Sequence, residues 1–181
     1  KDISMGVPQG SILGPLLFII LINDLPNASE LLFTILYADD TTLQFSSSNL
    51  HLLYKTANSE LEKLTDWFRA NQLTLNTSKT KYILFRDKKM FVDFSDLSLK
   101  IDNDNIDRIG EDCKEKFFKF VGLHLDEFLT WNHHAKYVRG KAASTVNSLS
   151  KLKNLLPKHV KYTVYNSLFR SYIEFGISCW G

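Results

Sequence analysis

The positions of apolar and polar residues along the chain predict two helices, over residues 11–23 and 49–71. The stretch 11–23 is apolar on nearly every side, which is typical of a helix packed inside a layered domain. Residues 49–71 instead carry apolar side chains at three- and four-residue intervals, the pattern of an amphipathic helix. We therefore expect the first helix to be buried and the second, capped by the serines at 46–48, to have one apolar face.

Between these two helices, a pair of carboxylates interrupts two β-compatible runs. Residues 31–37 are mostly apolar and residues 41–45 are again β-compatible. Two such runs around a short interval predict a tight hairpin. Asp39 and Asp40 would then lie at its tip.

The second half of the chain changes from short strands to helices. Strands are predicted at 81–85, 97–101, 106–109 and, most strongly, 117–125. Thr130 can cap a following helix, and Pro157 suits the first turn of another. This order predicts an α+β fold with a mixed sheet domain over residues 1–126 and a small helical domain over 127–181.

Composition narrows the classes of protein. A chain of 181 residues with 44% hydrophobic residues can bury a core. The 22 Lys and Arg are nearly balanced by 20 Asp and Glu, so the total charge does not indicate a nucleic-acid partner. Such a partner must be argued from local basic patches. The two cysteines lie far apart, which favours a reducing, intracellular setting over a disulfide or zinc scaffold. The longest apolar run, 16–22, is too short to span a membrane, so no membrane partner is expected.

The adjacent carboxylates of Asp39 and Asp40 are the strongest candidates for chemistry. Like charges leaving water repel each other unless a cation compensates them. Mg²⁺ prefers a few carboxylates together with phosphates and water, and a pair of such ions assists phosphoryl transfer. A solvated acidic turn is the simplest alternative, since Asp is common in hairpin loops. The surrounding sequence has to decide between the two interpretations.

That surrounding sequence consists of ordered motifs. The segment 6–18 contains Pro8, Gln9 and Gly10 and is followed by Tyr37-Ala38-Asp39-Asp40. Weaker matches continue in order through 73–80, 120–126 and 172–180. Together they resemble the reverse transcriptases of non-LTR (LINE-type) retrotransposons over nearly the whole chain. The resemblance implies a partial polymerase palm over residues 1–126 and a partial helical thumb over 127–181.

The resemblance also implies roles for individual residues. Asp39 would be the principal Mg²⁺ ligand, with Mn²⁺ as a substitute ion, and Asp40 a second ligand or electrostatic support. Lys79 would neutralise or protonate the departing pyrophosphate, a role for which Lys81 competes. The residues implied to border the incoming deoxynucleotide, the template base or the primer terminus are Pro8, Gln9, Gly10, Ser11, Tyr37 and Ala38.

Primer binding is implied for a second segment. Phe120, Val121, Gly122 and Leu123 resemble the primer-grip hairpin, although a plain buried strand would explain each side chain nearly as well. The lysines and arginines of residues 136–161 are candidates for phosphate contacts. The implied partners are an RNA template, a DNA primer and deoxynucleoside triphosphates, with action in the nucleus and cytoplasm.

The resemblance further implies parts that precede these motifs in the family, namely another aspartate ligand and the fingers. Only residues 1–5 precede the first motif here, and Asp2 is too close to it to be that ligand. We therefore expect a truncated polymerase that is inactive by itself and depends on the upstream fingers and palm segment. The alternatives are an RNA-templated RNA polymerase, a non-catalytic nucleic-acid-binding or scaffold remnant, and an accidental acidic turn.

Overall fold

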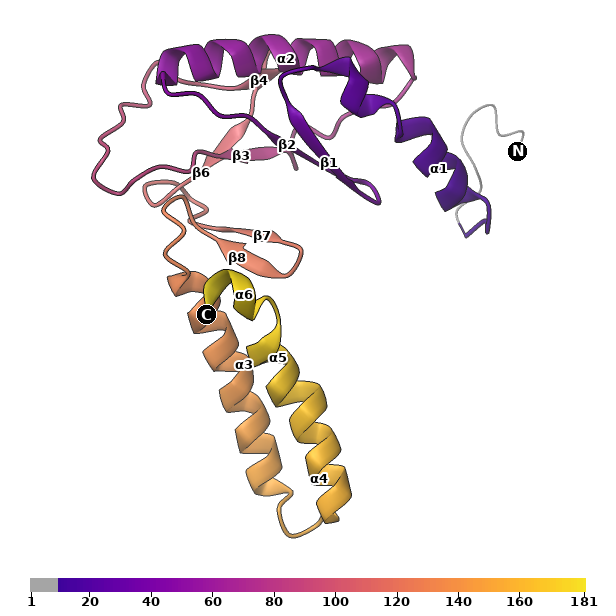
Figure 1. Ribbon diagram of the computed structural model, residues 1–181, viewed down its shortest axis with the longest axis vertical. Helices are drawn as coiled ribbons and strands as arrows, with labels where there is room; N and C mark the ends of the chain where they lie inside the picture. Colours follow the sequence, from indigo (N-terminus) through magenta and orange to yellow (C-terminus); the bar gives the residue numbers. More distant parts are fainter. Residues whose placement is uncertain (1–9) are drawn as a thin grey trace. The chain divides into compact units, whose positions relative to one another are not determined.

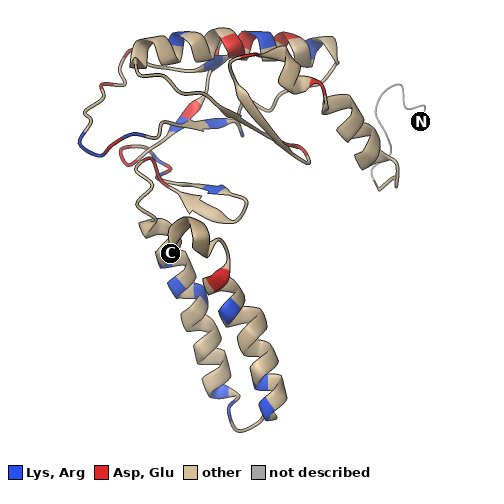
Figure 2. Ribbon diagram, viewed as in Figure 1, with Lys and Arg blue, Asp and Glu red and all other residues tan. Residues whose placement is uncertain are grey.

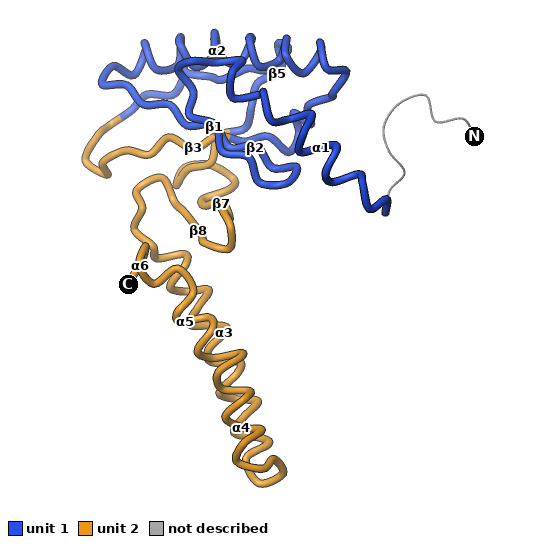
Figure 3. The backbone as a smooth tube through the Cα atoms, turned by 45° about the vertical axis from the view of Figure 1, so that its right-hand side comes forward, with its two compact units in different colours: residues 1–81, 92–107 blue, residues 82–91, 108–181 orange. Residues whose placement is uncertain are grey.

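The computed structural model describes residues 10–181, and these residues form two compact units (Figures 1 and 3). Unit 1 comprises Lys1–Lys81 and Val92–Asp107, and unit 2 comprises Tyr82–Phe91 and Arg108–Gly181. Helices combine with small antiparallel sheets, so the predicted α+β class is confirmed. Pro8 and Gln9, both predicted site residues, lie outside the described residues.

Unit 1 combines helices with a β-hairpin and a second, shorter pair of strands. Its elements are α1 (Gly14–Ile22), the 3-10 helix η1 (Leu25–Ala28), β1 (Phe33–Tyr37), β2 (Asp40–Gln44), α2 (Leu50–Ala70), β4 (Lys100–Ile101) and β5 (Asp104–Asn105). The strand pairs β1–β2 and β4–β5 are both antiparallel. In Figure 1 the β1–β2 hairpin begins beneath α2 and its tip points away from the helix, and β4 contacts α2.

The core of unit 1 joins the hairpin to α2. Ile22, Leu25, Leu32 and Leu64 are buried in one cluster, and Leu25 has no exposed surface. These residues come from four separate segments: the end of α1, η1, the approach to β1, and α2. Burial of four aliphatic side chains in one cluster therefore fixes the hairpin on the apolar face of α2.

The amphipathic prediction for α2 is confirmed, but its capping residue was predicted wrongly. The Asn49 side chain, and not one of the serines, accepts a hydrogen bond from Leu52 N at 3.0 Å. Asn58 also fastens the segment before β4 to the helix, because its side chain donates to Ser98 O and accepts from Lys100 N, both at 2.9 Å.

A buried carboxylate of α2 ties the helix to the approach to β1. Glu60 accepts hydrogen bonds from the Ser29 hydroxyl at 2.6 Å and the Lys63 ammonium at 2.7 Å. Ser29 Oγ in turn accepts from Leu32 N at 3.1 Å. The bonds from Lys63 and Ser29 hold the pKa of the Glu60 carboxyl below its ordinary value.

The expectation of a buried first helix is wrong for the described residues. α1 begins at Gly14, three residues after Ser11, and only Gly14 and Ile22 are buried in it. Leu16, Ile19 and Ile20 are each more than half exposed. A helix that is apolar on every side can leave most of its surface uncovered in a small unit, because the core of unit 1 contacts only one side of α1, through Phe18 and Ile22.

Unit 2 contains short strands followed by a helical hairpin. Its elements include β7 (Phe118–Phe120), β8 (Leu123–Leu125), α3 (Asn132–Lys151), α4 (Lys158–Val164), the π-helix η2 (Tyr165–Arg170), α5 (Ser171–Glu174) and α6 (Ile177–Trp180). At the boundary of the units, β3 (Lys81–Ile83) pairs with β6 (Asp107–Ile109). Figure 1 shows α3 side by side with the α4–η2–α5 segment, and α3 contacts both η2 and α5.

A buried glutamate organises the loops of unit 2. Glu127 is 1% exposed and accepts hydrogen bonds from Arg86 Nε at 3.1 Å and Glu111 N at 2.7 Å. Arg86 N also donates to Glu127 O at 3.1 Å. A carboxylate taken out of water needs this full set of partners, so Glu127 holds three loops together.

Two local predictions for unit 2 are corrected by the structure. The segment 117–125 is not one strand but the β7–β8 hairpin. Thr130 does not cap α3, whose N-cap is Trp131 in the left-handed region with φ 62°. The Thr130 side chain instead donates to Asp126 Oδ2 at 2.9 Å. The palm–thumb boundary at residues 126/127 falls inside unit 2 and stays a prediction.

Candidate functional site

The carboxylates lie at the end of a short, regular hairpin. β1 and β2 pair in register from Phe33 with Gln44 to Tyr37 with Asp40. Only Ala38 and Asp39 remain for the turn, so the predicted tight hairpin is confirmed. Ala38 adopts φ 53°, a left-handed conformation that costs a residue with a Cβ about 1 kcal/mol. The two carboxylates are therefore held at the turn by backbone pairing.

The two faces of this hairpin have different surroundings. Side chains alternate across a strand, so Leu36 and Leu43 share one face, and both pack against the core of unit 1. Tyr37 and Asp40 share the opposite face, together with Phe33. Phe33 and Tyr37 are 65% and 67% exposed. One face is thus used for folding, and the other stays open beside the carboxylates.

Asp39 and Asp40 are both exposed, one in the turn and one as the first residue of β2. The hairpin therefore packs its half-buried face on the core and leaves its tip in solvent. Two neighbouring carboxylates offer hard oxygen ligands suited to Mg²⁺. Within residues 10–181, no group of three or more His, Cys, Asp and Glu could hold a metal ion. A bound ion would therefore need further oxygen ligands from water, a phosphate or other protein residues.

Of the remaining described site residues of unit 1, Gly10 and Lys79 are exposed and Ser11 is half-buried. Lys79 follows Asn76, whose side chain and carbonyl both accept from Lys79 N, at 3.2 and 3.1 Å. This turn fixes the backbone of Lys79 and leaves its ammonium group in solvent. Gly10 has φ 87° and no atom within 4 Å of where a Cβ would stand, which is compatible with close approach of a ligand. No hydrogen bond or ion pair among the described residues joins Lys79 to Asp39 or Asp40.

The second predicted site forms the β7–β8 hairpin of unit 2. Phe120 pairs with Leu123, and the chain turns through Val121 and Gly122. Both turn residues have positive φ, 45° and 92°, as in the type I′ turns that suit hairpins. A β-branched residue is rarely found in this conformation. Val121 nevertheless occupies it and is 58% exposed.

A cluster of aromatic and histidine rings lies behind this hairpin. His134 of α3 is 1% exposed, and its Nδ1 accepts a hydrogen bond from His124 N of β8 at 3.4 Å. Its ring meets that of Trp180 edge to face, with centroids 5.1 Å apart. Burial, and secondarily the charge of His124, lowers the pKa of His134 below its ordinary value of 6.5. Neutral His134 therefore serves as an acceptor inside the fold.

Basic residues are concentrated in the helical end of unit 2 (Figure 2). Residues 130–181 contain eight Lys and Arg but only one acidic residue, Glu174, although the whole chain carries a net charge of only +2. Glu174 is paired with Arg170 at 2.6 Å. The exposed basic residues of α3 and the loop after it are Lys136, Arg139, Lys141, Lys151 and Lys153. Such a local excess suits contact with a phosphate backbone.

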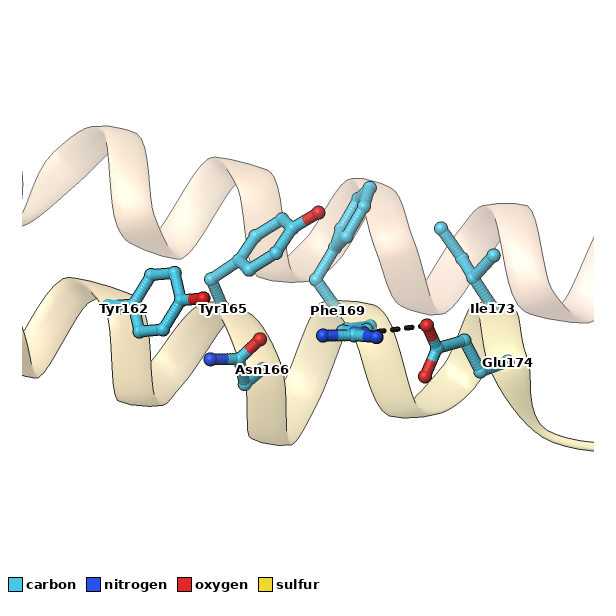
Figure 4. Close-up of a pocket in the computed structure, with 7 residues that line it drawn as sticks. Tyr162, Tyr165, Asn166, Phe169, Ile173 and Glu174 are labelled. Atoms are coloured by element: carbon cyan, nitrogen blue, oxygen red, sulfur yellow. Dashed lines mark hydrogen bonds and ion pairs between the residues drawn. The ribbon is translucent and has the colours of Figure 1, made fainter.

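A pocket on the α4–η2–α5 segment is lined by aromatic and polar side chains (Figure 4). Tyr165 and Phe169 stack with centroids 5.2 Å apart, and their side chains point toward the neighbouring helix. Tyr162, Asn166 and the Arg170–Glu174 ion pair form its outer side. None of the predicted site residues lines this pocket, and we assign no chemistry to it.

Sequence reasoning missed the supports of both hairpins. The buried acidic residue Glu60 interrupts the apolar face of α2, and the buried His134 interrupts that of α3. Phe175 and Gly176 were matched to a family motif without a role. A polar residue at an apolar position of a helix is a recognisable signal for the first two. Phe175 lies against Gly122, and Gly176 lies against Leu123, contacts more than fifty positions apart that no local sequence pattern signals.

Comparison with known families matches residues 1–125 to "Reverse transcriptase (RNA-dependent DNA polymerase)". Among curated relatives, the RNA-directed DNA polymerase from mobile element jockey of Drosophila melanogaster is 23% identical over 100% of this chain and 20% of its own length. A probable RNA-directed DNA polymerase from transposon BS of the same species is 30% identical over 97% of the chain and 20% of its own length.

A third relative is the retrovirus-related Pol polyprotein from type-1 retrotransposable element R1 of Bradysia coprophila. It is 24% identical over 99% of the chain and 18% of its own length. The chain thus spans about a fifth of the length of the curated relatives it matches. No solved structure matches it. Within the part of the chain that the structure describes, no helix is long and apolar enough to cross a membrane.

Proposed function

The chain belongs to the reverse transcriptase family, and we propose that it supplies the carboxylate hairpin and the primer-holding hairpin of a retrotransposon's RNA-directed DNA polymerase. The resemblance to the enzymes of non-LTR elements is confirmed by the family match and the relatives. The reaction would join a deoxynucleotide to the 3′ hydroxyl of a primer on an RNA template. One observation carries the proposal: Asp39 and Asp40 are presented at the exposed tip of a hairpin whose opposite face is fixed by a core.

The donor set of the hairpin tip fits Mg²⁺, and Mn²⁺ as a substitute. By the family resemblance, Asp39 would be the principal ligand, and it lies in the turn that ends the hairpin. Asp40 would be a second ligand or would support the charge of the first. When bound, Mg²⁺ would stabilise negative charge on the transferred phosphate and favour the ionised form of the attacking hydroxyl.

The open face of the β1–β2 hairpin would bind the primer terminus. Tyr37 lies in register with Asp40 on this face and is largely exposed, so its ring is available to contact the terminal nucleotide. Ala38 keeps the turn small. The incoming nucleotide would lie against Pro8, Gln9, Gly10 and Ser11, and the Lys79 ammonium would neutralise or protonate the departing pyrophosphate.

Unit 2 would hold the nucleic acid. Its β7–β8 hairpin ends in the exposed side chain of Val121, which offers an apolar contact to the primer strand. The basic residues of α3 and of the following loop would contact phosphates without reading sequence. The excess of positive charge in residues 130–181 supports this assignment.

Two carboxylates are few for a metal site that has to perform this reaction. We propose that a further ligand and the fingers come from the remainder of a longer polymerase, as in the family, and that the 181-residue chain extends primers negligibly by itself. The element would act inside the cell, in the nucleus and cytoplasm. Strong metal-dependent incorporation by the purified chain would overturn the inactivity proposal.

Metal binding at the hairpin can be tested on the chain itself. In ¹⁵N-labelled chain, Mn²⁺ should broaden the amide signals of residues 37–42 first, because paramagnetic relaxation acts over short distances. Asp39→Asn should remove most of this effect, since a neutral amide holds the ion poorly. Asp107→Asn, a change of another exposed aspartate of unit 1, is the matched control.

Each result separates the proposal from its alternative. Equal broadening in wild-type chain and Asp39→Asn would contradict the assignment of the ligand. A chain that binds a primer–template duplex but shows no selective broadening at residues 37–42 would favour a non-catalytic nucleic-acid-binding remnant.

A further inference from the structure

The turn of the β7–β8 hairpin is strained without being buried. Val121 adopts φ 45° although it is β-branched, and its side chain is 58% exposed. Burial of its own side chain therefore does not explain why this conformation is kept. Such strain persists only where neighbouring structure determines the backbone. The residues that determine it must be sought behind the turn.

Two glycine contacts lie behind the turn, and they are reciprocal. A Cβ on Gly122 would stand 2.9 Å from Phe175 Cε1, so the Phe175 ring lies directly against the Gly122 backbone. A Cβ on Gly176 would stand 2.8 Å from Leu123 Cδ2, so the Leu123 side chain lies against the Gly176 backbone. Each segment contributes one glycine and one large apolar side chain. Both glycines also have positive φ, 92° and 63°, which favours glycine at both positions.

The same two segments are joined again on a second side. Trp180 Nε1 donates to Phe175 O at 2.9 Å, and the Trp180 ring packs on His134. His134 Nδ1 accepts from His124 N, the residue after Leu123. Contacts thus link the hairpin to α3, α3 to α6, and α6 through Phe175 back to the hairpin. Phe175 lies in this circuit although its side chain is half exposed.

We propose that the Phe175–Gly176 turn is a positioning element that locks the Val121–Gly122 turn in its strained form and so presents Val121 to the primer strand. This inference rests on the proposed role of β7–β8 in holding the primer. Phe175 and Gly176 touch no substrate and act only through the hairpin. Their effect is on where the primer terminus lies rather than on how tightly the duplex binds, because phosphate contacts by the basic helices set the affinity.

The test uses the 181-residue chain with a DNA primer on an RNA template and 4-thiothymidine at the primer's 3′ end. Duplex affinity and photocrosslinking of the 3′ nucleotide to residues 118–125 are measured in parallel. Gly176→Ala, which drives a methyl group into Leu123, should lower the crosslink yield about tenfold at saturating duplex and leave Kd unchanged within about twofold. Phe175→Ala should act in the same direction.

Gly140→Ala is the matched control, because Gly140 lies in α3 with no atom within 4 Å of its missing Cβ. It should crosslink like the wild type. Hydrogen exchange in the absence of nucleic acid gives an independent measurement: amides of residues 118–125 should exchange faster in Gly176→Ala than in Gly140→Ala. Circular dichroism shows whether each variant is folded.

The outcomes separate this inference from the proposed function. Normal crosslinking and normal exchange in Gly176→Ala would overturn the positioning role alone. Parallel loss of crosslinking, affinity and helicity would reduce Gly176 to a general structural residue and also overturn it. Failure of the wild-type chain to crosslink at residues 118–125, despite binding the duplex, would overturn the primer-holding role of β7–β8 and this inference with it.

Discussion

Two hairpins of the chain, β1–β2 in unit 1 and β7–β8 in unit 2, share a turn of two residues whose first member carries a side chain at positive φ. Ala38 has φ 53° and Val121 has φ 45°. Their tips differ: the first presents the carboxylates of Asp39 and Asp40, and the second presents the apolar side chain of Val121. The turns share their length and a side chain at positive φ, but Gly122 also has positive φ whereas Asp39 does not. One turn is proposed to serve a cation and the other a nucleic-acid strand.

The supports of the two hairpins differ as well. Leu36 and Leu43 lie on a core that includes the fully buried Leu25. The β7–β8 hairpin rests instead on Phe175, Gly176 and the buried His134, in a cluster that leaves Phe175 half exposed. The aliphatic core does not titrate, and Glu60 beside it stays ionised until the pH falls below its ordinary pKa of 4.5, whereas His134 takes up its proton at a pKa below 6.5. The difference predicts that the two hairpins respond to different perturbations.

The largest effect is expected at the carboxylate tip. In a polymerase of the relatives' full length that contains this chain, Asp39→Asn should reduce primer extension on the order of 1,000-fold or more, because a neutral amide cannot replace the charged ligand. Steady-state extension of a primer on an RNA template measures it, with Asp107→Asn as control. Wild-type turnover in Asp39→Asn would show that the β1–β2 tip does not supply an essential metal ligand.

The core behind β1–β2 should be the next most sensitive position. Leu64 is 2% exposed, and Leu64→Ala should lower the free energy of unfolding by about 3 kcal/mol through the cavity it leaves. Urea denaturation measures the loss. Leu155→Ala, at a position 76% exposed, should change it by less than about 0.5 kcal/mol. If Leu64→Ala left β1–β2 as protected from hydrogen exchange as before, the core would not be its support.

Acid should affect the support of β7–β8. Because the pKa of folded His134 lies below 6.5, the unfolded chain takes up the proton first as pH falls. The contribution of His134 to stability is fully present above about pH 7 and is lost as pH falls from 6.5 through the lowered pKa. The loss is measured as the slope of the urea unfolding midpoint against pH.

A variant without the titrating ring sharpens the same prediction. His134→Gln should flatten the slope between pH 7 and 5, whatever its effect on absolute stability, while His159→Gln, at an exposed position, should not. His124, whose pKa is also lowered, chiefly by burial, would retain part of the slope. An unchanged slope in His134→Gln would show that acid acts elsewhere.

The smallest effect should be a gain in stability. Val121→Asn creates an Asn-Gly turn, which suits the type I′ geometry, and should stabilise the chain by about 1 kcal/mol through relief of strain. Thermal unfolding measures it. The same change should weaken the primer crosslink to residues 118–125, because the apolar side chain is lost. A variant that gained stability and kept the crosslink would show that the strain at Val121 has no role in primer contact.

Local patterns explain which predictions were confirmed. The spacing of Tyr54, Ala57 and Leu64 predicted α2, and the two β-compatible runs around Asp39 predicted the hairpin, because both signals depend on residues a few positions apart. The burial of α1 was predicted wrongly by the same reasoning. Uniform apolarity shows that burial of a helix would be favourable, but it does not show whether the described residues bury it.

The sequence by itself determined the family, through the order of its motifs, and the position of Asp39 and Asp40 at the tip of a tight hairpin. Only the tertiary structure decided what supports each tip. Gly122 and Phe175 are more than fifty positions apart, and their contact depends on where α3 and the C-terminal turn bring the chain. Periodicity reports which face of an element is apolar, but the partner that covers this face is chosen by packing across the whole unit.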